Sequence, residues 1–146
     1  MTEQIPKTIF IIVPKSRKNL KFNGTSIEFI KSKYFFGYKK VISNEGEIFI
    51  VDNEKLLIDC FLRYKELGNF DEIIKVFQQA EISKDKLIIY LKKMNSQAIT
   101  KRVGCLLDQE KNIDISKSFN IDNNYIKLNP FSKRYTNTIT KWRIKK

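Results

Sequence analysis

The chain has 146 residues, of which 42% are hydrophobic and 30% are charged. This balance is typical of one soluble globular domain with a single core, and it excludes a disordered chain. No apolar run approaches the roughly 20 residues that cross a bilayer, and residues 1–8 lack a signal-peptide core, so we expect a cytoplasmic protein with no membrane partner. Histidine is absent and only two cysteines occur, which excludes His-based catalysis and a zinc site.

A net charge of +12 attracts anionic partners in general, and of nucleic acid, acidic proteins and membrane surfaces we expect the first two. Lysine outnumbers arginine 23 to 5, a bias that an A/T-rich genome also produces, so codon usage is the alternative explanation of the charge. Residues 94–146 carry eleven basic and four acidic groups, residues 53–93 eight and seven, and residues 1–52 nine and five. The two ends of the chain are therefore more basic than its middle.

The first third of the chain predicts about five short strands, mostly antiparallel. Residues 8–13 are β-branched and aromatic, and Pro14 ends this strand. After a basic loop, residues 20–22 and 26–30 flank Asn23-Gly24, the strongest short hairpin signal, because both residues tolerate positive φ. A second pair of strands, residues 35–42 and 47–51, flanks a turn at 44–46.

From Asn53 onward the apolar period changes to that of helices. We expect four helices: one from Asn53 that Gly68 closes, and others that begin after Asn69, Ser83 and Ser96. Their inward faces give the predicted buried residues, Leu57, Cys60, Phe61, Ile73, Phe77, Leu91, Val103 and Leu107. Cys60 and Cys105 lie in apolar stretches and are expected to be free, buried thiols.

The last part of the chain returns to strands after a short helix expected over residues 113–119. Residues 125–128 and 138–144 have strand character, with Pro130 between them. Strands followed by helices and closing strands predict an α+β fold: a mainly antiparallel sheet packed against about four helices, with the C-terminal strands returning to the sheet. We find no repeat and no linker, and we predict a single domain over residues 1–146.

One group of residues suggests chemistry. The segment 52–55, Asp-Asn-Glu-Lys, follows a strand and opens a helix, the position that metal-binding carboxylates occupy in PD-(D/E)xK nucleases. The spacing differs from that pattern, and Asp52 before a helix with Glu54 in its first turn is ordinary capping chemistry. We therefore predict no enzyme, no catalytic residue, no metal and no cofactor, with a degenerate nuclease as the less favoured alternative.

Clusters of basic residues are the better candidates for binding. They are the loop residues Lys15, Arg17 and Lys18, the helical pair Lys101 and Arg102, and the tail residues Lys133, Arg134, Lys141, Arg143, Lys145 and Lys146. Such charges either contact a partner, through its phosphates or as a protein, or they remain solvated. Both alternatives are kept for each cluster.

Six segments in order resemble the C-terminal domain of AbiEi-type antitoxins from abortive-infection type IV toxin–antitoxin systems. The segments are 2–6 as a junction, 34–38 as a Phe-Gly strand, 54–59 as a Glu-Lys-x-Leu-x-Asp helix start, 101–107 as an Arg-Arg-Leu-Gly-Tyr-Leu-like helix, 125–130 as a Tyr-x-Leu-Asp-Pro-like strand and 142–144 as the ending. Asn53 in place of Ser-Pro and Val103 in place of Leu are departures from the family pattern.

The resemblance implies a non-catalytic role in phage defence. It implies that the domain counters a nucleotidyltransferase-like toxin, without a stable complex being required, and that a basic surface assists DNA binding in operon autoregulation. No winged helix precedes Met1, so we expect either an excised domain or a stand-alone gene product, with weak, non-specific DNA binding of its own. The alternative is a basic accessory nucleic-acid-binding domain of a transcriptional regulator.

Overall fold

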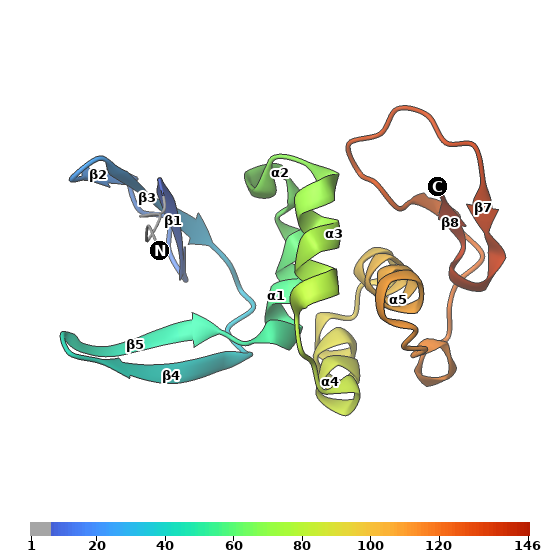
Figure 1. The fold of residues 1–146 in the computed structure, drawn as a ribbon, viewed down its shortest axis with the longest axis horizontal. Coiled ribbons are helices and arrows are strands. Elements are labelled where there is room, and N and C mark those ends of the chain that lie inside the picture. The colour runs from blue at the N-terminus through green and yellow to red at the C-terminus, as the bar shows by residue number, and fades with distance from the viewer. Residues whose placement is uncertain (1–6) are drawn as a thin grey trace. The chain divides into compact units, whose positions relative to one another are not determined.

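A computed structural model describes residues 7–146 and confirms the α+β class (Figure 1). The chain divides into two compact units, one up to Phe36 and one from Gly37 to Lys146, where the sequence predicts a single domain. Residues 2–6, which resemble the family's junction, lie outside the described residues.

The first unit is a three-stranded sheet in the order β1-β3-β2, formed by β1 (Thr8–Val13), β2 (Leu20–Phe22) and β3 (Thr25–Lys31). β2 and β3 form the antiparallel hairpin that Asn23-Gly24 predicts, with φ of 46° and 81° at these residues. β1 pairs with β3 in parallel, which the sequence did not predict. β3 is the longest of the three strands and lies at the centre of the sheet. The parallel pairing could not be predicted, because the alternation of side chains along a strand does not depend on the direction of its neighbour.

The second unit begins with an antiparallel hairpin of β4 (Tyr38–Ser43) and β5 (Gly46–Val51) and continues into helices. These are α1 (Asn53–Leu62), α2 (Tyr64–Leu67), α3 (Phe70–Gln79), α4 (Lys84–Met94) and α5 (Gln97–Lys111). The single helix expected up to Gly68 is therefore two, because Arg63 leaves the helical conformation, at φ −130° and ψ 34°. No Gly or Pro marks this break, so the sequence gives no signal for it.

The predicted helix starts are confirmed by their hydrogen bonds. The side chains of Asp52, Asn69, Ser83 and Ser96 each accept a bond from the backbone N–H three residues later, which satisfies a donor that the helix itself leaves free. These caps rest on contacts between near neighbours in the chain, which explains why they are readable from sequence.

The predicted core is confirmed. All eight residues expected to be buried are at most 3% exposed. They lie on α1, α3, α4 and α5, which pack together as Figure 1 shows. Trp142 and Ile144 complete this core from the C-terminal end, being 1% and 0% exposed.

The C-terminal strands form a sheet of their own, in the order β6-β8-β7, so the expectation that they return to the N-terminal sheet is wrong. They are β6 (Ile126–Lys127), β7 (Thr138–Ile139) and β8 (Ile144–Lys145), and they lie beyond α5 (Figure 1). The strand expected over residues 138–144 is interrupted by a 3-10 turn, Thr140–Trp142, that places the Trp142 indole against α5. The short helix expected at 113–119 is likewise a 3-10 turn, Ser116–Ser118.

Within residues 7–146, no helix combines the length and the apolar character needed to cross a membrane.

The cysteines give a first testable prediction. Both are free and buried, and burial raises the pKa of each thiol to about 12. A thiol with this pKa is protonated at pH 8, so Cys60 and Cys105 should react with a thiol reagent at least about 100 times more slowly in the native protein than in urea. Rapid modification of either cysteine in folded protein would contradict the burial.

Candidate functional site

The C-terminal sheet brings basic side chains together. Lys127 in β6 pairs with Lys145 in β8, in parallel register, so both side chains lie on the same face of the sheet. The neighbouring pair, Ile126 with Ile144, turns to the opposite face, where Ile144 is buried in the core. The alternation that buries Ile144 therefore places the two lysines side by side.

Lys127 and Lys145 also line a pocket of about 210 Å³. Four of the residues that line it are cationic, and none of the described lining residues is acidic. The cationic residues are Lys127, Arg134, Lys145 and Lys146, and Phe70 and Leu128 supply apolar wall. These six residues define what we call the C-terminal basic pocket.

The contacts of the pocket cations leave their charges unneutralised. The Lys127 ammonium donates to the carbonyl of Ser132 at 2.9 Å, and the Lys146 ammonium donates to Oε1 of Gln109 at 3.2 Å. The Lys145 ammonium lies 4.8 Å from the centre of the Tyr135 ring. The ion pairs formed among residues 7–146 involve other lysines.

The loop that carries Lys133 and Arg134 is fixed at both ends. At its start, the Asn129 side chain accepts from the Phe131 N–H at 2.9 Å. At its end, the N–H groups of Thr136 and Asn137 donate to the Lys146 carbonyl at 2.8 and 3.0 Å. Lys133 and Arg134 are both exposed on this loop, but only Arg134 lines the pocket.

Lys101, predicted as a contact residue, is a structural one. Its side chain is 1% exposed, and its ammonium donates to the Asp122 carboxylate and to the Asn124 carbonyl. Arg102 is half-buried: its Nε donates to the Lys127 carbonyl at 2.8 Å, and burial lowers the pKa of its guanidinium. These two residues hold β6 and the preceding loop against α5, and Lys101 is removed from the accessible basic surface.

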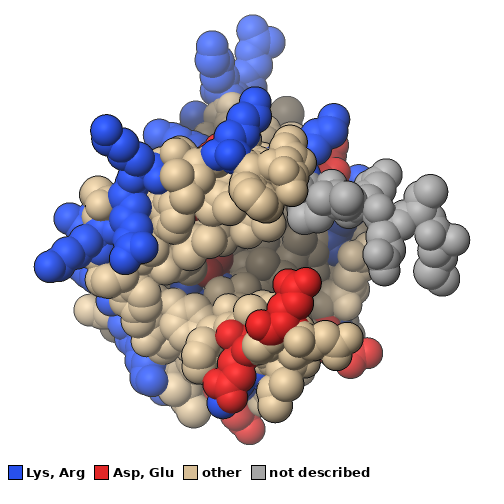
Figure 2. Space-filling view, turned by 90° about the vertical axis from the view of Figure 1, so that its left-hand side faces the viewer, with Lys and Arg blue, Asp and Glu red and all other residues tan. Residues whose placement is uncertain are grey.

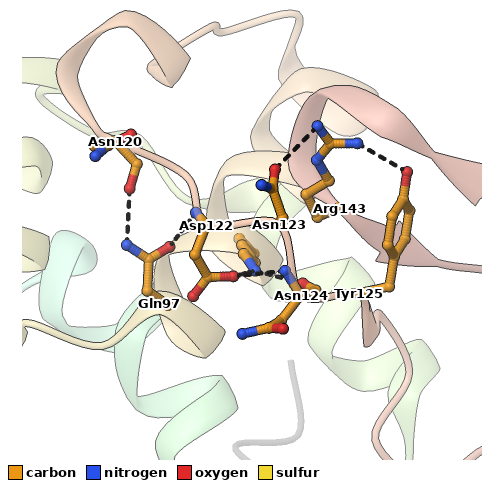
Figure 3. Close-up of polar contacts among 8 residues, drawn as sticks. Gln97, Asn120, Asp122, Asn123, Asn124, Tyr125 and Arg143 are labelled. Atoms are coloured by element: carbon orange, nitrogen blue, oxygen red, sulfur yellow. Dashed lines mark hydrogen bonds and ion pairs between the residues drawn. The ribbon is translucent and has the colours of Figure 1, made fainter.

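Lys141 and Arg143 are also tied to the fold. The Lys141 ammonium donates to Asp108 at 2.7 Å and to Asp114 at 2.9 Å, and these bonds raise its pKa. Arg143 donates to the Tyr125 hydroxyl at 3.2 Å and to the Asn123 side chain at 3.3 Å. Figure 3 shows the bonds from Arg143 to Asn123 and Tyr125, which join β8 to the polar network of the loop before β6.

Lys15, Arg17 and Lys18 lie between β1 and β2 in the first unit, and all three are exposed. Lys and Arg side chains project widely from the surface drawn in Figure 2. The second unit holds the other predicted cations.

Of the basic residues predicted in the tail, Arg134, Lys145 and Lys146 line the pocket. Lys127 also lines it and was not predicted from the sequence.

The carboxylates at the start of α1 form a clamp. Asp52 accepts from the Lys55 N–H, from the Tyr90 hydroxyl at 2.8 Å and from the Lys86 ammonium at 2.9 Å. Glu54 accepts from the Ser83 N–H at 2.6 Å and from the same ammonium at 3.1 Å. The two acids thus join α1 to α4, which is the capping role predicted for Asp52 and a larger role than predicted for Glu54.

This geometry changes the expected effect of Glu54→Ala. As a first-turn acid alone, Glu54 would contribute about 1 kcal/mol. Its side chain is 6% exposed and holds two donors, so we expect a loss of about 2–3 kcal/mol in the free energy of unfolding. Glu47→Ala, at an exposed ion pair in the hairpin, is the control and should change stability by less than about 0.5 kcal/mol. Equal effects in urea unfolding would contradict the clamp.

The clamp also predicts acid sensitivity. Burial by itself raises the pKa of Glu54, but the hydrogen bonds from Ser83 and Lys86 outweigh it and hold the pKa below its usual value. A depressed carboxyl pKa contributes stability that is present above the unfolded pKa, about 4.3, and is lost as the pH falls through the folded value. Unfolding of the wild type should therefore become easier below about pH 4, and Glu54→Gln should lessen this dependence.

No family model matches the chain, and a search of curated proteins finds no significant match.

Proposed function

We propose that this chain is a non-catalytic binding domain of the antitoxin type, which counters a nucleotidyltransferase-like toxin and contacts anionic partners through the C-terminal basic pocket and the adjacent loop. The observation that supports it best is the gathering of four cations around one pocket with no acidic residue in its described lining. The order of segments that resemble AbiEi-type antitoxins supports the toxin as the functional partner.

The proposal includes no enzyme activity. The carboxylates that would serve a nuclease, Asp52 and Glu54, accept hydrogen bonds from Lys86 and from the backbone of α1 and α4. We expect purified protein with magnesium to leave DNA uncut, and cutting that Glu54→Ala abolishes would reverse this assignment. The proposal also places the chain in the cytoplasm, where its two free thiols remain reduced.

A second candidate function, an accessory nucleic-acid-binding domain of a transcriptional regulator, is favoured by the same pocket. Phosphate contacts release counterions, so the logarithm of the binding constant should fall linearly with the logarithm of the salt concentration. The domain should bind duplex DNA weakly and without sequence preference. Tight, sequence-selective binding at physiological salt would contradict this role.

Charge reversal identifies the surface used. We expect Lys133→Glu combined with Arg134→Glu to weaken binding to a duplex with 5′-hydroxyl ends and to reduce the salt slope by about 2, since each lost phosphate contact removes about one unit. Lys15→Glu combined with Arg17→Glu changes the charge equally in the first unit and is the matched control. Fluorescence anisotropy at several salt concentrations gives both quantities. A larger loss in the control would move the interface to the first unit.

A further inference from the structure

We propose that the C-terminal basic pocket binds a terminal phosphate monoester, the group at the end of a nucleotide or of a polynucleotide. The inference rests on the proposed function, since it names the chemical group that the same surface takes. It makes a separate claim, however: a discrete site for one group rather than a diffuse basic field.

The cations of the pocket are arranged so that they repel one another. Lys127 and Lys145 are direct partners across β6 and β8, and like charges directly opposite each other destabilise a sheet. Arg134 and Lys146 line the same pocket and add two further positive charges. An anion seated among these four cations would turn a repulsive arrangement into an attractive one.

The amount of positive charge at the pocket also favours a phosphate monoester. A phosphate monoester carries about −1.5 to −2 at pH 7, whereas a backbone phosphodiester carries a single charge. A guanidinium recognises phosphate oxygens in a bidentate manner, and lysine ammonium groups add point charges around it. One arginine and three lysines around one pocket match the more highly charged monoester better than the diester.

The size and polarity of the pocket fit a phosphate with an attached sugar. The volume of about 210 Å³ corresponds to about seven water molecules, and it is below the roughly 300–1,000 Å³ of sites that enclose drug-sized ligands. It holds a phosphate with its attached sugar and leaves a base outside. Phe70 gives the sugar an apolar surface, which a site for a free inorganic ion would not need.

The test uses the full chain at low salt and titrates it with adenosine 5′-monophosphate, adenosine and inorganic phosphate by calorimetry. We expect the nucleotide to bind at one site, phosphate to compete with it, and adenosine not to bind. A second arm compares a short single-stranded oligonucleotide that carries a 5′-phosphate with the same strand ending in a 5′-hydroxyl. Preference for the phosphorylated strand over the free nucleotide would identify a nucleic-acid end as the source, and the reverse order would identify a free nucleotide.

The variants are matched by position. Arg134→Gln removes a cation that lines the pocket, and Lys133→Gln removes its exposed neighbour on the same loop that does not line it. We expect Arg134→Gln to weaken binding of the nucleotide about tenfold and Lys133→Gln less than about twofold. Lys145→Gln, checked for folding by thermal unfolding, should also weaken it about tenfold.

Equal losses in the two loop variants, or adenosine binding as tightly as its monophosphate, would overturn the pocket. Binding of the 5′-hydroxyl duplex reports on the proposed function separately. If that duplex binds with the expected salt dependence while the nucleotide does not bind, the pocket is wrong and the basic surface remains. If the nucleotide binds and neither DNA binding nor toxin neutralisation is found, the proposed function is wrong and the pocket remains.

Discussion

Gly104→Ala should destabilise the protein by about 3 kcal/mol or more, although glycine to alanine within a helix ordinarily gains up to about 1 kcal/mol. Gly104 lies in the middle of α5, and a Cβ there would stand 2.2 Å from a ring carbon of Trp142. The indole cannot yield easily, because it is 1% exposed and its N–H donates to Asp108 at 2.7 Å. Urea unfolding measures the loss, and a stabilised variant would contradict the packing.

The reason for the loss is tested by a double mutant. Trp142→Leu removes the ring that the new methyl group would meet, at the cost of a large buried side chain. In the Trp142→Leu background, Gly104→Ala should lower the free energy of unfolding by at least about 1 kcal/mol less than it does in the wild type. The reason is that the effects of substituting two residues in contact are not additive. Full additivity would show that the alanine acts on the helix itself and not through Trp142.

Asp59→Ala should destabilise the protein by about 3–5 kcal/mol, the range for breaking a buried ion pair from one side. Lys55 and Asp59 are one helical turn apart on α1, and their side chains are 0% and 11% exposed. Removing the carboxylate takes away the counter-charge of an ammonium that stays inside the core. Thermal or urea unfolding measures the change.

Replacing both partners isolates the charge from the packing. Lys55→Met combined with Asp59→Leu fills the site with apolar side chains and leaves no buried charge there. We expect this double variant to recover most of the loss and to unfold within about 1 kcal/mol of the wild type. A double variant as unstable as Asp59→Ala would show that shape, and not charge, makes Asp59 important.

The features that sequence reasoning predicted correctly depend on contacts between near neighbours. They are the helix caps such as Asp52 and Ser96, the Asn23-Gly24 hairpin and the apolar faces of the helices. Each depends on residues that are close together in the sequence. The separate C-terminal sheet is different. Within it, Trp142 packs against Gly104, 38 positions earlier in the sequence, a contact that no local pattern encodes.

Three of the segments that carry the resemblance, residues 54–59, 101–107 and 142–144, make structural contacts. Lys55 and Asp59 form the buried pair of α1, Lys101 anchors the loop before β6, and Gly104 receives Trp142. Their spacing specifies the packing of the helices and of the C-terminal sheet, and it identifies no binding surface.

The candidate site was only partly predictable. Charge density in the tail indicated Lys133, Arg134, Lys145 and Lys146, and three of these line the pocket. Lys127 was missed because it stands alone among apolar residues, and its pairing with Lys145 depends on parallel register between distant strands. Lys101 was wrongly expected to lie on the accessible basic surface. A lysine beside an arginine on a helix suggests an exposed side chain, whereas the Lys101 side chain is buried and bonded to Asp122, 21 residues later.

The most direct test of the proposed function is neutralisation of the toxin. A nucleotidyltransferase-like toxin of the abortive-infection type is expressed in growing cells together with this chain, and growth is followed for the wild type and for two charge-reversed variants. We expect the wild type to relieve growth arrest, Lys133→Glu with Arg134→Glu to lose most of that protection, and Lys15→Glu with Arg17→Glu to retain it. Growth arrest that continues in the presence of folded wild-type protein would contradict the antitoxin assignment.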